Sequence, residues 1–198
     1  IKHFFALAPA LSSLHLGSSF IWDAAEQAAA EENPFARSYN TILGNICAEP
    51  VLNQLCYSSF REYSGPITQV EESQLQLVTS HFPGGTSNKN IKHWMQQMII
   101  GTKYFDYGSE GNLEAYGSMY PREYNFSVYS VPTSLYFSMD DKLVNSEDMK
   151  IALTRLPTSA IVKSRNLTGF GHFEFVWGSR AKAEIYDGII ADMNKMDN

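Results

Sequence analysis

Residues 132–163 read PTSLYFSMDDKLVNSEDMKIALTRLPTSAIVK, and this stretch decides the fold. Residues 132–138 form an apolar run of strand length, and residues 159–163 form a second one. Between them, Asn145 is placed to cap a helix, and residues 180–196 predict another helix after the second strand. Strand, helix, strand and helix in tandem predict an α/β fold built on a parallel sheet.

The chain before this tandem is organised differently. Residues 3–9 predict a short buried strand that a proline stops, whereas residues 18 to 103 carry mostly helical signals. Ser18 and Ser19 are placed to cap a helix that Asn33-Pro34 would break. Further helices are expected over 51–60, over 70–78 and over a segment with Ile91, Trp94, Met95, Met98 and Ile99 on one face.

Residues 105–129 are rich in Gly, Tyr and Pro and are expected to form an irregular loop. The chain opens on Ile1 rather than Met, and it opens directly on the predicted buried strand. We therefore expect that neighbours which precede this strand in the fold lie upstream of Ile1.

Composition excludes several classes of function. The formal net charge is −6, and the 15 basic residues are dispersed, which argues against a nucleic-acid partner. The same acidity does not favour an anionic membrane surface. No apolar run approaches the roughly 20 residues that cross a bilayer, so no transmembrane segment is expected. The sequence offers no ligand cluster for a metal and no sign of an organic cofactor.

Two cysteines, Cys47 and Cys56, lie in one short segment. They are either a buried free pair or, in an oxidising compartment, a disulfide. Two glycosylation sequons, at Asn125 (Asn-Phe-Ser) and at Asn166 (Asn-Leu-Thr), favour the oxidising compartment and therefore secretion.

An Asp and a His follow the two predicted strands. Asp140 and Asp141 come directly after the first strand, and His172 follows the second by a short loop. Ligands of parallel sheets bind beyond the carboxyl ends of the strands, and Asp before His is the order of an α/β-hydrolase triad. The alternative is a helix-capping Asp and an ordinary loop His. No G-x-S-x-G elbow is present, and the two cysteines suit a bridge better than a nucleophile.

Several motifs resemble the acid lipases, the gastric and lysosomal group. Residues 81–87 with His93-Trp94 are similar to that family's H-x-P-[AG]-G-T-S…H-W, and residues 171–178 are similar to its N-H-L-D-F-I-W-G. Residues 105–109, 124–127 and 4–9 also match family segments, so that the resemblance runs over nearly the whole chain.

The resemblance implies a role for each matched residue. It makes His172 the catalytic base and Asp141 the triad acid, with Asp140 just before it, while the nucleophilic Ser and the oxyanion donors belong upstream. It also implies a Cys47–Cys56 disulfide within the cap and a glycosylated Asn125. The chain departs from the family at Asn145 and Glu174, where an Asp is usual, and in the sequon at Asn166 close to the His.

For the domains, the resemblance implies a core strand over residues 1–10, a helical cap and lid over 11–104, and the C-terminal α/β-hydrolase core over 105–198. Apolar residues of the cap serve either the lipid-facing surface or core packing (Ile21, Trp22, Leu43, Trp94, Met98).

For function, the resemblance implies hydrolysis of carboxylic esters of neutral lipids, triacylglycerols or cholesteryl esters, at a lipid–water interface. No cofactor is needed, and the expected location is secreted or lysosomal. The chain by itself, without a nucleophile, is expected to be inactive. The alternatives are a non-catalytic lipid-binding relative and an esterase for smaller esters.

Overall fold

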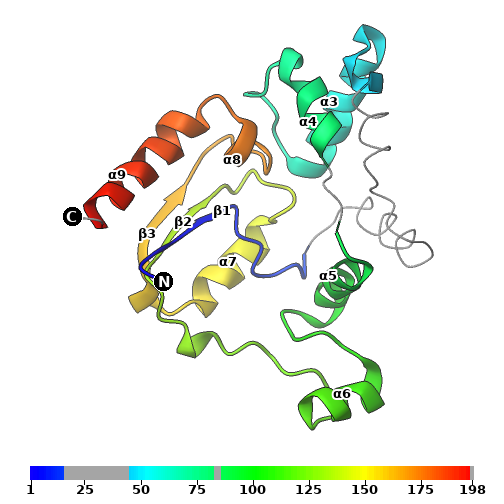
Figure 1. Cartoon of the computed structure of the whole chain (residues 1–198), viewed down its shortest axis with the longest axis vertical. Helices are drawn as coiled ribbons and strands as arrows, with labels where there is room; N and C mark the ends of the chain where they lie inside the picture. Colours follow the sequence, from blue (N-terminus) through cyan, green and yellow to red (C-terminus); the bar gives the residue numbers. More distant parts are fainter. Residues whose placement is uncertain (16–44, 83–85, 197–198) are drawn as a thin grey trace.

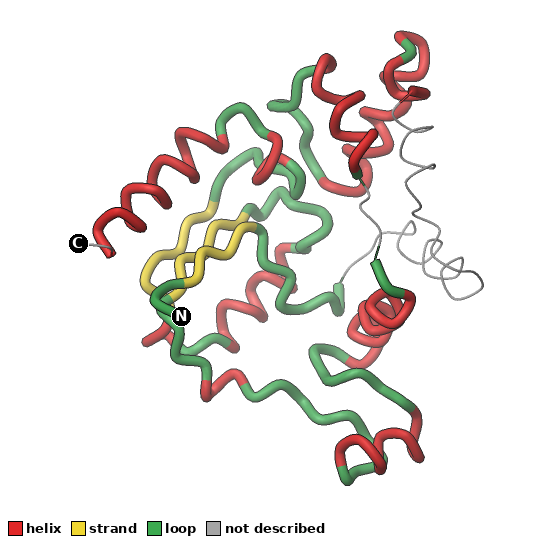
Figure 2. The backbone as a smooth tube through the Cα atoms, viewed as in Figure 1, coloured by secondary structure: helices red, strands yellow, loops and turns green. Residues whose placement is uncertain are grey.

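The computed structural model describes residues 1–15, 45–82 and 86–196. Three strands form one parallel sheet in the order β1 (Phe4–Leu7), β2 (Thr133–Phe137) and β3 (Ile161–Asn166) (Figures 1 and 2). Phe4 pairs with Thr133, and Thr133 pairs with Ile161, so segments far apart in the sequence share one sheet. The predicted α/β class with a parallel sheet is confirmed.

Helices cover both faces of the sheet (Figure 1). Strand residues alternate between the faces: Ala6, Leu135 and Phe137 pack against α7 (Ser146–Arg155), and Tyr136 packs on the opposite side. That opposite side is covered by α8 (Glu174–Trp177), by the π-helical turn η3 (Lys182–Tyr186) and by α9 (Asp187–Met196). All five residues of β2 are buried because the strand lies between two layers of helices.

Local signals explain the bounds of α7 and β3. The Asn145 side chain accepts a hydrogen bond from the Glu147 N–H at 2.8 Å, which confirms the predicted helix cap. The second strand was predicted over 159–163, but residues 158–160 form the 3-10 turn η2 (Thr158–Ala160) and β3 runs from Ile161. The predicted final helix over 180–196 is divided into η3 and α9.

Among the described helices that lie outside the sheet layers are α3 (Pro50–Ser64), α4 (Glu72–His81) and α5 (Asn88–Ile100) (Figure 1). They confirm the helices predicted over 51–60, over 70–78 and around Ile91, although each one has shifted bounds. Pro50 starts α3 because it needs no N–H partner, and a Glu71–Gln74 capping box starts α4. The predicted helix after Ser18, its break at Asn33-Pro34, and the turn at Pro83 to Gly85 lie outside the described residues.

The expectation of an irregular loop over 105–129 is wrong. This stretch contains α6 (Gly108–Tyr116) and the 3-10 turn η1 (Phe126–Val128). The Asp106 carboxylate accepts hydrogen bonds from the N–H of Gly108 and the amide of Asn112, whose own oxygen accepts from Tyr107. These polar side chains start the helix, and Gly117, in a left-handed conformation, ends it.

Within the part of the chain that the structure describes, no helix is both long and apolar enough to cross a membrane.

Candidate active site

The structure brings Asp141 and His172 together beyond the carboxyl ends of β2 and β3. The Nδ1 atom of His172 lies 2.8 Å from Oδ2 of Asp141. The Asp141 side chain is 1% exposed and the His172 side chain 29%, so the acid is buried and the imidazole reaches solvent. Over residues 1–15, 45–82 and 86–196, the contact with Asp141 is the one side-chain hydrogen bond of the His172 imidazole, and it engages Nδ1.

Asp141 is held from both sides. Its Oδ1 accepts the backbone N–H groups of Leu143 and Val144, each at 2.8 Å, while Oδ2 faces the imidazole. The turn after β2 therefore orients the Asp141 carboxylate through its own backbone N–H groups, independently of His172. An Asp bound to Nδ1 sets the tautomer with Nε2 free and stabilises the imidazolium that forms when Nε2 takes a proton.

The two nearby carboxylates, Asp140 and Asp148, form hydrogen bonds with other partners. Asp140 is exposed, and its Oδ2 accepts the Gly169 N–H at 2.7 Å, which joins the Asp-bearing loop to the His-bearing loop. Asp148 is buried, and it accepts hydrogen bonds from the side chain of Ser12 and from the backbone of Leu14 and His15. Neither carboxylate is hydrogen-bonded to His172.

Two other groupings of a Ser with a His lie within the described part of the chain, and neither forms a triad. Ser12 donates to Asp148 at 2.6 Å, but His15 contacts the same carboxylate oxygen and does not stand between the two. His3 Nε2 lies 2.9 Å from the Ser134 hydroxyl, but Ser134 is 1% exposed and is the second residue of β2, away from the strand's carboxyl end. The Ser12 hydroxyl is therefore bound to a carboxylate and not to a base, and the Ser134 hydroxyl is bound to an imidazole but is buried, so neither has the base-bound and accessible hydroxyl of a nucleophile.

Aromatic rings line the region next to His172. The Phe173 ring lies 5.5 Å from Phe60 of α3 and 4.9 Å from Phe82, which follows α4. Trp177 of α8 lies 5.4 Å from Phe82, and the His172 and Phe173 rings are 5.8 Å apart. An aromatic cluster that the sequence pattern alone did not group together therefore contacts His172 through the ring of Phe173.

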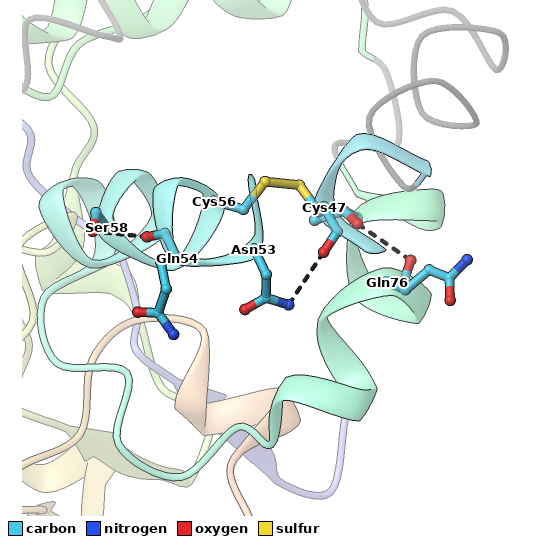
Figure 3. Close-up of a disulfide and its surroundings, with 7 residues drawn as sticks. Cys47, Asn53, Gln54, Cys56, Ser58 and Gln76 are labelled. Atoms are coloured by element: carbon cyan, nitrogen blue, oxygen red, sulfur yellow. Dashed lines mark hydrogen bonds between the residues drawn. A yellow bond between two sulfur atoms is a disulfide. The ribbon is translucent and has the colours of Figure 1, made fainter. Parts of the chain in front are cut away.

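The structure also places the remaining predicted residues. Cys47, in the helical turn before α3, is joined to Cys56 of α3 by a disulfide with a Cα–Cα distance of 5.7 Å (Figure 3). Asn53 donates its side-chain amide to the Cys47 carbonyl beside this bridge (Figure 3). Asn125 and Asn166 are both exposed.

Of the apolar residues that were expected to belong to a cap, Trp94 is exposed and Met98 is buried, whereas Ile21, Trp22 and Leu43 lie outside the described residues. Among the residues that the structure covers, no group of three or more His, Cys, Asp or Glu side chains could hold a metal ion.

The sequence was compared with family models and with known proteins. No family model matches the chain. The lipase lipl-1 of Caenorhabditis elegans is 31% identical over 205 residues, which cover 96% of this chain and 51% of that protein. The lysosomal acid lipase/cholesteryl ester hydrolase of Rattus norvegicus is 29% identical over 98% of this chain and 51% of its own length. The gastric triacylglycerol lipase of Homo sapiens is 28% identical over 74% of this chain and 37% of its own.

A parallel sheet with helices on both faces is the architecture of the C-terminal part of an α/β-hydrolase. Within that class, the chain belongs to the acid lipase family, as the similarity along most of its length shows. The chain spans about half the length of the curated relatives that match it over most of its residues.

Proposed function

We propose that the protein which carries this chain hydrolyses carboxylic esters of neutral lipids, triacylglycerols or cholesteryl esters, in a secreted or lysosomal compartment. The observation that carries the proposal is the 2.8 Å contact between Asp141 and His172 at the carboxyl ends of adjacent parallel strands. The names of the relatives support an ester substrate, the aromatic rings beside His172 support an apolar one, and the disulfide supports an oxidising compartment.

In the proposed reaction, Nε2 of His172 removes the proton from a serine hydroxyl while the serine oxygen attacks the acyl carbon. The same nitrogen then delivers that proton to the leaving alcohol oxygen as the ester bond breaks. In the second half, Nε2 takes a proton from water while the water oxygen attacks the acyl carbon of the acyl-enzyme. Nε2 then returns that proton to the serine oxygen as the acyl–oxygen bond breaks, which releases the carboxylic acid and restores the free serine. Throughout, Oδ2 of Asp141 holds the Nδ1–H and offsets the charge of the imidazolium.

The nucleophile is proposed to lie outside these 198 residues, because they contain no G-x-S-x-G. For the organisation of this chain, we propose a core strand over 1–10, a cap over 11–104 and a hydrolase core over 105–198.

Activity of the full-length protein tests the proposal. It is expected to cleave a long-chain fatty acyl ester and to be labelled at a serine by an alkyl phosphonate, whereas the 198-residue chain alone does neither. Lipid binding by the full-length protein without turnover or labelling would indicate a non-catalytic relative. Turnover of short soluble esters alone would indicate a small-ester esterase, and activity of the 198-residue chain would place the nucleophile within it.

A further inference from the structure

Residues 64–69 run from the last residue of α3 into the loop before α4, and we refer to them as the connector. The connector lies against the two loops that carry Asp141 and His172, the pair that we call the dyad. The backbone carbonyl of Ser64 accepts the N–H of His172 at 2.8 Å and that of Lys142, the residue after Asp141, at 3.4 Å. One oxygen atom at the end of α3 therefore contacts the backbone of both loops that carry the dyad.

The contact between the connector and the dyad loops leaves no room for side chains. A Cβ atom added to Gly171 would lie 2.0 Å from the Pro66 carbonyl oxygen, and one added to Gly65 would lie 2.3 Å from the Asp140 carbonyl oxygen. Gly65 also has a φ of +89°, a conformation that other residues rarely adopt. Backbone therefore meets backbone on both sides, and the connector fixes the distance between the loops.

A buried carboxylate holds this arrangement together. Glu174, at 0% exposure, accepts hydrogen bonds at Oε1 from the N–H of Thr68 at 2.5 Å and the N–H of Gln69 at 2.8 Å. Its Oε2 accepts the N–H of Gly171 at 3.0 Å and the side-chain amide of Gln69 at 3.2 Å. Oε1 thus binds the backbone of the connector, and Oε2 joins the side chain of Gln69 in the connector to the N–H of Gly171, the residue before His172.

We propose that Glu174 is a positioning residue for the Asp141–His172 pair, which acts by joining the connector to the His172 loop. This inference rests on the proposed function for its effect on catalysis. Four N–H groups from two segments converge on one carboxylate, so its two oxygens set the position of the Gly171 peptide relative to Ser64. The Ser64 carbonyl in turn sets His172 against the loop of Asp141.

Glu174→Gln in the full-length protein is the main test. A glutamine has the same shape but only one acceptor oxygen, so two of the four N–H groups would face an amide donor instead. The Gly171 peptide should shift, and a displacement of about 1 Å at a reacting group costs on the order of 10²-fold in rate. The loss is expected in kcat with KM nearly unchanged, because Glu174 is buried and does not reach the substrate.

A spectroscopic readout separates positioning from a purely structural role. The His172 Nδ1–H, bonded to a carboxylate, should give a low-field proton NMR signal that His172→Ala removes. In Glu174→Gln this signal should move upfield or broaden, and in Glu174→Asp, which keeps both acceptor oxygens on a shorter stem, it should be partly restored together with kcat. The matched control is Glu114→Gln, an exposed residue of α6 for which kcat and the signal should be unchanged.

The inference would be overturned if Glu174→Gln had a lower melting temperature but kept the wild-type kcat and an unchanged Nδ1–H signal. If Glu174→Gln does not fold, the Glu174→Asp variant is the test. In that case a wild-type kcat and an unchanged Nδ1–H signal in Glu174→Asp would overturn the inference. If the full-length protein has no esterase activity, the proposed function fails, and the signal alone then decides whether Glu174 positions the pair.

Discussion

At the scale of single residues, the role proposed for Asp141 follows from the atoms that its two carboxylate oxygens contact. Leu143 and Val144 both donate backbone N–H groups to Oδ1, so that position requires an acceptor. In Asp141→Asn the amide oxygen must occupy it, and the NH₂ group then faces Nδ1 of His172. Nδ1 can only accept in that case, so the imidazole proton moves to Nε2 and the base cannot take a proton from serine.

We therefore expect Asp141→Asn to lower kcat of the full-length protein by several orders of magnitude, and His172→Ala by about 10⁴-fold or more. Hydrolysis rates of a long-chain ester measure both changes, with a melting curve for each variant to exclude unfolding. Activity of Asp141→Asn near that of wild type would mean that another group orients His172.

Asp140 allows a sharper comparison, because its role is that of an acceptor and not of a charge. Its Oδ2 binds the Gly169 N–H at 2.7 Å. Asp140→Asn keeps an acceptor and should change kcat little, whereas Asp140→Ala frees the His172 loop from this contact and should lower kcat more. Measurements of kcat for the two variants under the same conditions test this difference. An equal loss of kcat in Asp140→Asn and Asp140→Ala would assign the effect to the charge of Asp140 instead.

At the scale of elements, the disulfide stabilises α3, the helix whose last carbonyl contacts both dyad loops. The double variant Cys47→Ser/Cys56→Ser should lose about 2–3 kcal/mol of unfolding free energy, the amount expected when a short loop is no longer closed in the unfolded chain. Urea denaturation with and without reductant measures it. Reductant should lower the urea midpoint of the wild type and leave that of the variant unchanged. Equal urea midpoints for the oxidised wild type and the variant would contradict the prediction.

The pair Lys163–Asp192 joins β3 to α9 at 2.5 Å. The hydrogen bond from Lys163 lowers the pKa of Asp192, and the hydrogen bond accepted by Asp192 raises the pKa of Lys163. The contribution of Asp192 is therefore complete above its unfolded pKa of about 3.9 and is lost as the pH falls through its lower folded value. The contribution of Lys163 is complete below about 10.4 and is lost as the pH rises through its higher folded value.

Asp192→Asn should consequently lower the melting temperature at pH 7 and at pH 5, and the difference from wild type should disappear only well below pH 4. Thermal unfolding across this pH range measures it. Asp187→Asn, which breaks an exposed pair between Asp187 of α9 and Lys182 of η3, is the control and should have a smaller effect. A difference that persists unchanged at the acid extreme would assign the loss to something other than this ion pair.

How far these elements could be predicted depends on whether their causes are local. The strands around Asp141 and His172 follow from short apolar runs, and strand ends of a parallel sheet share an edge, so the two residues could be paired from the sequence. Helix α6 was missed because it is a short helix within a stretch rich in Gly, Tyr and Pro, and because the Asp106 and Asn112 side chains that start it are residue types common in loops. The Glu174 contacts join residues 106 positions apart, and the Ser64 carbonyl is a backbone atom with no sequence signal.

At the scale of the whole molecule, the two sequons occupy different surroundings. Asn125 lies in an exposed turn where its side chain accepts from Ser127. Asn166 ends β3 and accepts the Met139 N–H, at the same edge of the sheet as the dyad. We expect Asn125 to carry a glycan and Asn166 to be unmodified when the protein is expressed through a secretory pathway.

Glycopeptide mass spectrometry, together with Asn125→Gln and Asn166→Gln, tests this difference. Only Asn125→Gln should change the mass of the secreted protein beyond the substitution itself. A glycan at Asn166 would show that the edge beside the dyad tolerates a large hydrated group, which conflicts with the entry of a neutral lipid there.

The tight fit at Gly65 and Gly171 also determines how lipases of this kind could be recombined in the laboratory. A chimaera that exchanges the helical region of this protein for that of a relative would be cut most naturally between helices, and residues 64–69 are such a junction. If the segment taken from the relative had any residue other than glycine at position 65, its Cβ atom would clash with the Asp140 carbonyl oxygen. A cut at this junction would therefore separate two backbone segments that pack directly against each other. Crossover points before α3 and after α4 would keep the junction with its own core, and libraries built on those points should yield folded, active hybrids more often.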